Sequence, residues 1–236
     1  MLNEALPDAS EIKALFDRIA PVYDQMNNWL SLGQHRIWKQ MTVKWSEPRP
    51  GDRGLDVCCG SGDLSQLLAR QVGKKGQVIG VDFSPQLLAI ARQRAALTSP
   101  HLRLEFVEGD ALKLPFENNT FHCATMGYGL RNVTDIPLCL RELHRVLSSG
   151  AKVAILDFHQ PQGQLMQTFQ QWYLKTIVVS TAERLGLTAE YAYITPSLER
   201  FPTGQQQVKL GLKAGFSHAI HYPIAGGMMG VLVLTK

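Results

Sequence analysis

The chain has 236 residues, of which 45% are hydrophobic and 19% are charged, and its formal net charge is +4. This composition is typical of a globular protein with one substantial core. The charge is too small to indicate a nucleic-acid-binding protein, and no basic run interleaved with aromatic residues supports one. No apolar run of about 18 residues predicts a membrane-spanning helix, and no leader pattern predicts export.

The cysteines are Cys58, Cys59, Cys123 and Cys139, and no two of them form a C-x-x-C pair. This spacing disfavours a disulfide framework or a zinc site, and it favours a reducing compartment. We therefore expect a cytoplasmic protein without a metal site.

Residues 10–50 carry helical signals and several aromatic side chains ahead of the first strand. His35 and Trp38 are three residues apart and share one face of a helix. A lone histidine in such a place serves packing or capping more often than catalysis. We predict a helical lid over this range.

Residues 54–63 predict a buried strand, a tight glycine turn and the start of a helix, and Val81-Asp82 ends the next strand. This arrangement indicates a nucleotide-like ligand lying across two strands of an α/β sheet. The dinucleotide pattern G-x-G-x-x-G/A is incomplete, because its third position is Ser65. The pattern hydrophobic-Asp-hydrophobic-x-x-Gly-x-Gly fits residues 55–62, which favours S-adenosylmethionine (SAM) over NAD(P).

SAM has no phosphate groups, so its loop needs backbone room rather than an anion cradle. Asp56 is a candidate anchor for the amino-acid end of SAM, and glycines reach positive φ without a Cβ penalty. Asp63 is expected to be a helix N-cap rather than a ligand-binding residue. The candidate SAM-binding residues of this turn are Asp56, Cys58, Gly60, Ser61 and Gly62.

The ends of the next two strands supply the remaining adenosine contacts. Asp82 is placed to accept hydrogen bonds from ribose hydroxyls, with a helix N-terminal acid as the alternative. Asp110 and the Ala111 amide are candidates for the adenine, with a surface turn as the alternative. Phe83 is expected beside the adenine or in the core.

The fourth strand runs into Gly127 and a loop that extends to residue 133, which we expect beside the transferred methyl group. Gly127 lets the backbone approach the cofactor. Arg131 and Asn132 are polar residues flanked by apolar ones and are candidate catalytic residues. The alternative is an ion pair of Arg131 with Asp135 together with helix capping.

From about residue 53 onward, strands and helices alternate, which predicts right-handed crossovers and a parallel sheet. Ser84 and Pro85 predict the N-cap and first residue of one helix. Residues 217–223 and 228–235 predict a terminal hairpin with an antiparallel strand. Residues 160–205 add cap helices, one of which carries the following residues roughly along one side: Leu165, Phe169, Trp172, Thr176, Ile177 and Val179. We expect a single domain over residues 1–236.

The N-terminal segment resembles a signature of the ubiquinone/menaquinone biosynthesis C-methyltransferase family, Tyr-Asp-x-Met-Asn, then Ser, then His-x-x-Trp. The matching residues are Tyr23, Asp24, Met26, Asn27, Ser31, His35 and Trp38. A second family segment matches residues 129–133, and the resemblance runs from about residue 12 to the end. The chain departs from the family at Cys58-Cys59, at residues 148–151, and at residues 157–159, where the family usually has Glu-x-Ser.

The resemblance implies a Rossmann-like class I SAM-dependent methyltransferase fold, with a mostly parallel seven-stranded sheet. It implies C-methylation of a prenylated naphthoquinol, and the C-terminal tail looks like the branch from oxygenic phototrophs that methylates demethylphylloquinone. Arg131 would stabilise the naphtholate oxygen and Asn132 would orient it or Arg131, while Tyr23 and His35 are candidates for proton transfer. The alternatives are demethylmenaquinone or a benzoquinol, a chromanol precursor or a sterol.

Two alternatives of another class remain at this stage, an NAD(P)-dependent oxidoreductase and a non-catalytic subunit with a SAM fold. A substrate with a long apolar chain implies peripheral contact at the inner face of a photosynthetic or plasma membrane. The helix expected at 164–180 is a candidate for this contact, although core or dimer contact would explain its apolar side too. The sequence leaves a homodimer open.

Overall fold

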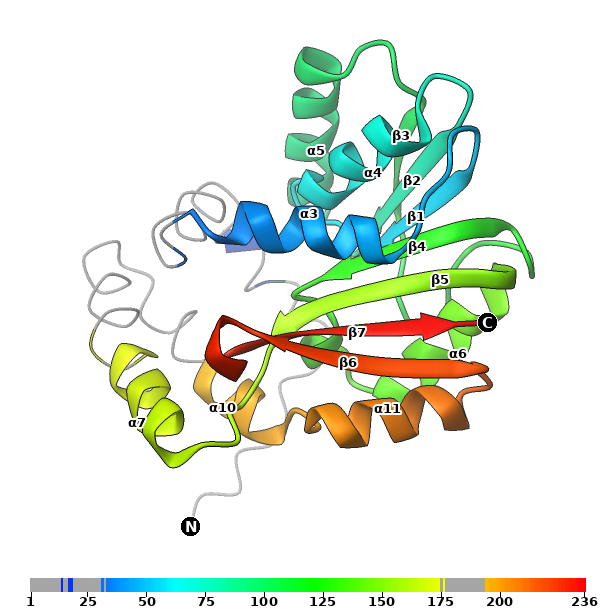
Figure 1. Cartoon of the computed structure of the whole chain (residues 1–236). Helices are drawn as coiled ribbons and strands as arrows, with labels where there is room; N and C mark the ends of the chain where they lie inside the picture. The colour runs from blue at the N-terminus through cyan, green and yellow to red at the C-terminus, as the bar shows by residue number, and fades with distance from the viewer. Residues whose placement is uncertain (1–13, 15–16, 19–30, 32, 175, 177–193) are drawn as a thin grey trace.

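One seven-stranded sheet organises the molecule, with the strand order β3-β2-β1-β4-β5-β7-β6 (Figure 1). The structure is a computed structural model that describes residue 14 and residues 17–18, 31, 33–174, 176 and 194–236. Strands β1 to β5 pair in parallel, whereas β7 runs antiparallel to both β5 and β6. The predicted parallel sheet with a C-terminal hairpin is confirmed. The strands are β1 Arg53–Val57, β2 Gln77–Asp82, β3 Leu104–Glu108, β4 Phe121–Gly127, β5 Leu147–Phe158, β6 His218–Ile224 and β7 Met229–Thr235.

Helices cover both faces of this sheet, as right-handed crossovers require (Figure 1). Helices α4 and α5 connect β1, β2 and β3 on one face, while α6 connects β4 to β5 and contacts α11. The described helices and 3-10 turns are α3 His35–Trp45, α4 Asp63–Val72, α5 Pro85–Thr98, η1 Leu130–Asn132, α6 Ile136–Val146, α7 Gln164–Tyr173, α10 Ile194–Arg200, α11 Gly204–Lys213 and η3 Ala225–Gly227.

The core is built from strands that are buried on both faces. Leu55 and Val57 of β1 are fully buried, as expected for an inner strand of a parallel sheet. Helix α6 presents Cys139, Leu140 and Leu143 to the same cluster, and these side chains are also fully buried. Burial of this stripe fixes the rotation of α6 and therefore the direction of the loop that precedes it.

A ligand crevice follows from the strand order. Strand β1 lies between β2 and β4, so the chain leaves the carboxyl ends of β1 and β4 toward opposite faces. Such a switch point leaves a crevice outside the carboxyl ends of the strands. The predicted strand ends at Asp82 and Gly127 are confirmed.

Helix α5 begins as the sequence predicts. Ser84 is the N-cap, its hydroxyl accepts a hydrogen bond from the Leu87 N–H at 3.2 Å, and Pro85 is the first helical residue. Ser84 also donates a hydrogen bond to the Asp17 carboxylate of the N-terminal segment.

The predicted N-cap of α4 is wrong by one residue. Gly62 is the N-cap, in the left-handed region at φ 85°, and Asp63 is the first helical residue. The Asp63 carboxylate instead accepts from Lys39 Nζ at 2.7 Å and lies 3.3 Å from Arg94 Nη1. Both pairs are structural, and Lys39 joins the lid helix α3 to α4.

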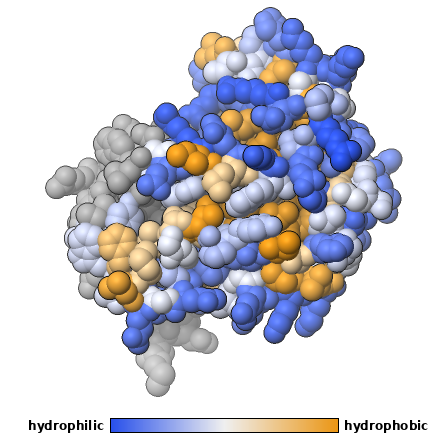
Figure 2. Space-filling view, in the orientation of Figure 1, coloured by the Kyte–Doolittle hydropathy of each residue, from blue (hydrophilic) through white to orange (hydrophobic). Residues whose placement is uncertain are grey.

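The additions to the sheet are partly described. Helix α3 belongs to the predicted lid and contacts α4 and β5, while α7 and α10 belong to the predicted insertion at 160–205. Figure 2 shows apolar side chains at the surface over α7. Within the described residues, no helix combines the length and the apolarity that crossing a bilayer requires.

Helix α6 offers a test of local stability. The exposed Asp135 caps it, because its carboxylate accepts from the Leu138 N–H at 2.8 Å. We expect Asp135→Ala to lower the free energy of unfolding by about 1 kcal/mol, since one N–H at the helix start loses its acceptor. Asp135→Ser keeps a side-chain acceptor and should retain most of the stability. Equal urea midpoints for the two variants would contradict this role.

Candidate functional site

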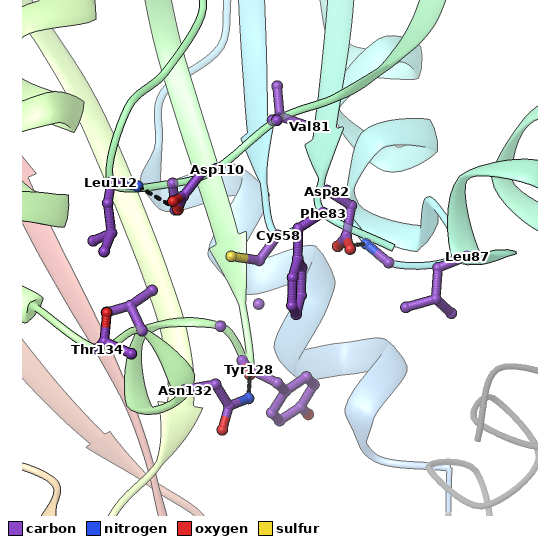
Figure 3. A pocket seen from close by; sticks show the side chains of 16 residues that line it. Cys58, Val81, Asp82, Phe83, Leu87, Asp110, Leu112, Tyr128, Asn132 and Thr134 are labelled. Carbon is purple, nitrogen blue, oxygen red and sulfur yellow. Dashed lines mark hydrogen bonds between the residues drawn. The ribbon is translucent and has the colours of Figure 1, made fainter. Parts of the chain in front are cut away.

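A cavity of about 300 Å³ lies at the carboxyl ends of the first four strands. Four loops line it, one after each of β1, β2, β3 and β4. Figure 3 shows the labelled side chains of these loops around a shared hollow. The candidate residues on its wall are Cys58, Gly60, Asp82, Phe83, Asp110, Ala111, Gly127 and Asn132. The tertiary structure therefore brings together residues that lie far apart in the sequence.

The loop after β1 leaves its backbone open to the cavity. Gly60 has φ 54°, and no atom lies within 4 Å of the position that a Cβ would occupy. Cys58 also has a positive φ, of 54°, which is uncommon for a residue with a side chain. A Cβ on Gly129 would lie 2.6 Å from the Cys58 Cβ, so this close contact requires glycine at 129. Burial raises the pKa of the Cys58 thiol well above its usual value.

Asp82 ties this loop to the end of β2. Its carboxylate accepts from the Gly60 N–H at 2.8 Å and from the Ser84 N–H at 3.0 Å. Burial raises the pKa of this carboxyl above its ordinary value, although the backbone donors oppose that shift. A carboxylate has about four acceptor positions. Asp82 therefore retains acceptor capacity toward the cavity, where ribose hydroxyls would be suitable donors.

The loop after β3 is held by Asp110. Its Oδ1 accepts from the Leu112 N–H at 2.9 Å, an Asx turn that places Asp110, Ala111 and Leu112 on the cavity wall (Figure 3). Both alternatives for Asp110, a turn residue and a cavity residue, therefore apply to it. Phe83 also lines the cavity, and its place beside the adenine stays a prediction.

Asp56 lies behind the cavity wall and is fully buried. Its carboxylate accepts from the Ser65 hydroxyl at 2.6 Å and from the Thr125 hydroxyl at 2.9 Å. Burial raises its pKa from 3.8 to about 7, against the effect of the two hydroxyls and Lys39. Ser65 thus occupies the third glycine position of the dinucleotide pattern because it satisfies a buried carboxylate.

The loop after β4 turns sharply at the cavity. A Cβ on Gly127 would lie 2.7 Å from Leu64 Cδ1, so a larger residue here would displace this buried side chain of α4. Tyr128 has φ 60°, and its carbonyl accepts from Asn132 Nδ2 at 2.9 Å. This hydrogen bond fixes the orientation of the amide. Among the described residues, Asn132 Oδ1 is buried without a hydrogen-bond partner and is therefore an open acceptor.

Arg131 makes a buried ion pair with Asp157, at the end of β5. Nη1 of Arg131 lies 2.9 Å from Asp157 Oδ1, and the Arg131 N–H donates to Oδ2 at 3.0 Å. Nη1 also donates to the Tyr128 carbonyl at 2.8 Å, and the guanidinium lies over the Phe158 ring. The alternative pair with Asp135 is wrong, since Asp135 caps α6. Arg131 itself is not on the cavity wall.

The other candidates lie away from the wall. Ser61 and Gly62 belong to the turn before α4 but do not line the cavity. His35 is buried at the start of α3, where its Nδ1 lies 2.7 Å from the Ser31 hydroxyl. Tyr23 lies outside the described residues. The roles predicted for these residues stay predictions.

Sequence reasoning missed several residues of this site. Three residues in or next to the predicted loop after β4 line the cavity, although none of them was named as a candidate: Tyr128, Val133 and Thr134. Leu112 follows the predicted Asp110-Ala111 pair, so simple adjacency would have found it. Asp157 had only one signal, its place at the end of a strand next to β4.

The site has no metal-binding character in the part of the chain that is described. No cluster of three His, Cys, Asp or Glu side chains there could hold a metal ion. The four cysteines are all free thiols, and three of them are buried.

The order of the strands and the crevice define a Rossmann-like class I SAM-dependent methyltransferase fold. Solved structures agree. A SAM-dependent methyltransferase from Thermotoga maritima superposes with a TM-score of 0.66 at 20% identity, over 95% of this chain and 99% of that one. One from Aquifex aeolicus has a TM-score of 0.61 at 18% identity, over 97% and 98%. The predicted fold class is confirmed.

Sequence comparison gives the family. The model of the ubiE/COQ5 methyltransferase family matches residues 4–236, and the chain belongs to this family. It is therefore a methyltransferase, as predicted, and the oxidoreductase alternative is not supported. It is similar to a 2-phytyl-1,4-naphthoquinone methyltransferase from Nostoc sp. strain PCC 7120, with 63% identity over 96% of this chain and 99% of that one. A chloroplastic protein of that kind from Arabidopsis thaliana is 48% identical, over 97% and 88%.

Asp56 predicts a pH dependence of stability. Its pKa is higher in the folded chain than in the unfolded one, so the folded state binds the proton more tightly. Its contribution to stability is full below pH 4 and is lost as the pH rises through about 7. Asp56→Asn keeps an uncharged side chain of the same shape. Between these pH values, the free energy of unfolding of the wild type should fall by a few kcal/mol relative to that of this variant.

Urea unfolding of the wild type and Asp56→Asn across this pH range measures the difference between their free energies of unfolding. Ser65→Ala removes a donor to the carboxylate and should extend the decline to higher pH. A difference between wild type and Asp56→Asn that does not change with pH would contradict the assignment.

Proposed function

We propose that the chain transfers the methyl group of SAM to a ring carbon of a prenylated naphthoquinol, and that its substrate is demethylphylloquinone in the reduced form. The observation that carries this proposal is the 63% identity, over almost the whole chain, to a relative named for a 2-phytyl-1,4-naphthoquinone substrate. Demethylmenaquinol is the second candidate, since it has the same ring.

The described cavity fits SAM. Asp82 has acceptor capacity for ribose hydroxyls, Gly60 leaves its backbone uncovered, and Asp110 and Ala111 present polar backbone and side-chain groups. When bound, SAM supplies a methyl group on a positively charged sulfur, which is already activated for attack by a carbon nucleophile. The protein therefore has to position the acceptor and favour its nucleophilic form.

The open acceptor at Asn132 supports a reduced substrate. Its Nδ2 is already used on the Tyr128 carbonyl, and its Oδ1 is buried without a hydrogen-bond partner among the described groups. A quinol hydroxyl can donate to this oxygen, whereas a quinone carbonyl cannot. An unmatched buried acceptor is costly, and this cost disfavours the oxidised ring.

The chemistry requires loss of a phenolic proton, which pushes electron density onto the neighbouring ring carbon. That carbon forms the new C–C bond to the methyl group as the bond from this methyl to the sulfonium sulfur breaks, which leaves a neutral thioether. The ring carbon's own hydrogen leaves as a proton when the ring becomes aromatic again. We assign Arg131 to stabilisation of the naphtholate oxygen, directly or through the loop that it braces. We assign Tyr23 and His35 to the proton transfer, because both residue types can act as general acids or bases. His35 begins the lid helix α3, and Tyr23 precedes it in the sequence.

A labelled-methyl transfer assay tests the substrate. We expect the highest kcat/KM for the phytylated demethylnaphthoquinol, a lower value for polyisoprenylated forms, and no transfer to the oxidised quinone. Asp82→Ala is the inactive control, since it removes the proposed ribose acceptor. Preference for a benzoquinol, or absence of transfer to every quinol, would overturn the proposal.

A second experiment tests Arg131. We expect Arg131→Ala to keep SAM binding by calorimetry but to lose about 10²-fold in turnover, the scale of a lost oxyanion donor. The substitution also leaves Asp157 buried without its partner, which costs about 3–5 kcal/mol of stability. The double variant Arg131→Ala/Asp157→Asn removes that charge, so it should regain stability without regaining turnover. Turnover near the wild-type rate in the double variant would exclude Arg131 from the reaction.

A membrane-resident substrate places the protein at a membrane surface, and we propose peripheral contact from the cytoplasmic side. The phytyl chain has about 20 carbons, and each exposed CH₂ costs about 0.8 kcal/mol in water. A cavity of about 300 Å³ is at the small end for one ligand, so this chain must extend beyond it. Uptake of the substrate directly from the bilayer avoids its exposure to water.

A further inference from the structure

Helix α7 exposes a stripe of large apolar side chains. One polar side chain is buried instead, because Gln170 Nε2 donates to the His159 carbonyl at 2.8 Å, and the exposed Gln167 donates from Nε2 to the Pro161 carbonyl at 2.8 Å. Gln170 is only 6% exposed. Surface helices normally bury their apolar side and present polar residues to water. In α7 three large apolar side chains face outward, whereas Met166 and Tyr173 are half-buried.

The outward face of α7 consists of Leu165, Phe169 and Trp172, which are 82%, 44% and 53% exposed. Their spacing of four and three residues puts them in one stripe along the helix. The Phe169 ring lies 5.9 Å from the Trp172 ring and 6.2 Å from the Tyr173 ring. The stripe therefore joins aromatic and aliphatic side chains, and Figure 2 shows apolar side chains at the surface over α7.

The helix is firmly seated behind this face. Met166 packs against η3, where a Cβ on Gly226 would lie 2.7 Å from the Met166 Cε atom. With the two glutamine hydrogen bonds, this contact fixes which side of α7 points outward. The outward face is thus a consequence of the packing of α7, and rotating the helix would leave the buried Gln170 amide without its partner.

A lipid bilayer fits this face better than a protein partner does. Residues 164–173 contain no charged side chain, so insertion desolvates no charge and no ion pairs select a partner. One face of a ten-residue helix is much smaller than the roughly 800 Å² per partner of a stable dimer. Trp172 and Tyr173 combine an apolar ring with a polar atom, which suits the boundary between headgroups and acyl chains.

The position of α7 fits the same environment. The helix begins at Gln164, shortly after β5 ends at Phe158. It therefore lies beyond the carboxyl ends of the strands, at the end of the sheet that carries the cavity (Figure 1). A membrane in contact with α7 would face the edge from which a lipid substrate enters.

We propose that the outward face of α7 inserts into the interfacial region of a lipid bilayer and docks the enzyme there. The lipid nature of the substrate rests on the proposed function, but the insertion itself is independent of catalysis. Only the apolar stripe enters, as for amphipathic helices that lie in the membrane plane.

Flotation of the full chain with phosphatidylcholine vesicles tests the proposal. Substituting Leu165, Phe169 and Trp172 together by Gln should lower the vesicle-bound fraction by about tenfold or more, because the inserted area is lost. Binding should persist at high salt, since α7 carries no charge. Unchanged flotation of the triple variant, or loss of wild-type binding at high salt, would overturn the proposal.

The matched control substitutes exposed apolar residues elsewhere, Leu97→Gln, Leu212→Gln and Ile220→Gln, which are 76%, 48% and 51% exposed in the wild type. It should float like the wild type, and equal loss in the control would overturn the assignment to α7. If the α7 triple variant fails to fold, brominated lipid gives a second measurement. It should quench the part of the wild-type emission that Trp172→Phe removes, and absence of quenching would overturn the proposal.

Two further readouts separate the outcomes. Methyl transfer to a demethylnaphthoquinol that lacks the phytyl chain should be equal in wild type and α7 variant. If both proteins fail to carry out this transfer, the result contradicts the proposed function but not the membrane docking, because flotation is measured without methyl transfer. A change from dimer to monomer in the α7 variant without vesicles would overturn the proposal in favour of a second copy of the chain.

Discussion

The hydrogen bond from the Gly60 N–H to Asp82 is the contact on which the site depends. It joins the glycine turn after β1 to the end of β2, and the same carboxylate also accepts from the N–H of Ser84 at the start of α5. One buried acid therefore positions two loops and a helix. Because it does so while keeping acceptor capacity, a single residue organises the cavity and remains available to a ligand.

Two other buried acids stabilise the walls from behind. Asp56 holds the hydroxyls of Ser65 and Thr125, which join α4 and β4 to β1, and Asp157 holds Arg131 at the end of β5. Burial raises the pKa of both carboxyls, so their charged forms carry a cost in stability. This cost is tolerated where the groups fix the loops around a ligand, which is a common property of functional sites.

Local signals in the sequence predicted much of the architecture. Ser84 and Pro85 predicted the start of α5 because capping depends on neighbouring residues only. Asp63 was misplaced by one residue, since Gly62 reaches the left-handed conformation that the turn demands and so takes the cap position. Arg131 was predicted at the site, with an ion pair to Asp135, which is near in sequence, as the alternative, whereas the structure pairs it with Asp157 on another strand.

The sequence by itself determined the α/β alternation, the carboxylates at the strand ends and the family, because these depend on periodicity and on motifs within one segment. Only the tertiary structure decided which of those residues share a cavity, where Arg131 finds its counter-ion and which side of α7 faces outward. Each of these depends on contacts between segments far apart in the chain. An apolar stripe such as that of Leu165, Phe169 and Trp172 predicts burial by spacing alone, whereas packing leaves these side chains exposed and buries Gln170 instead.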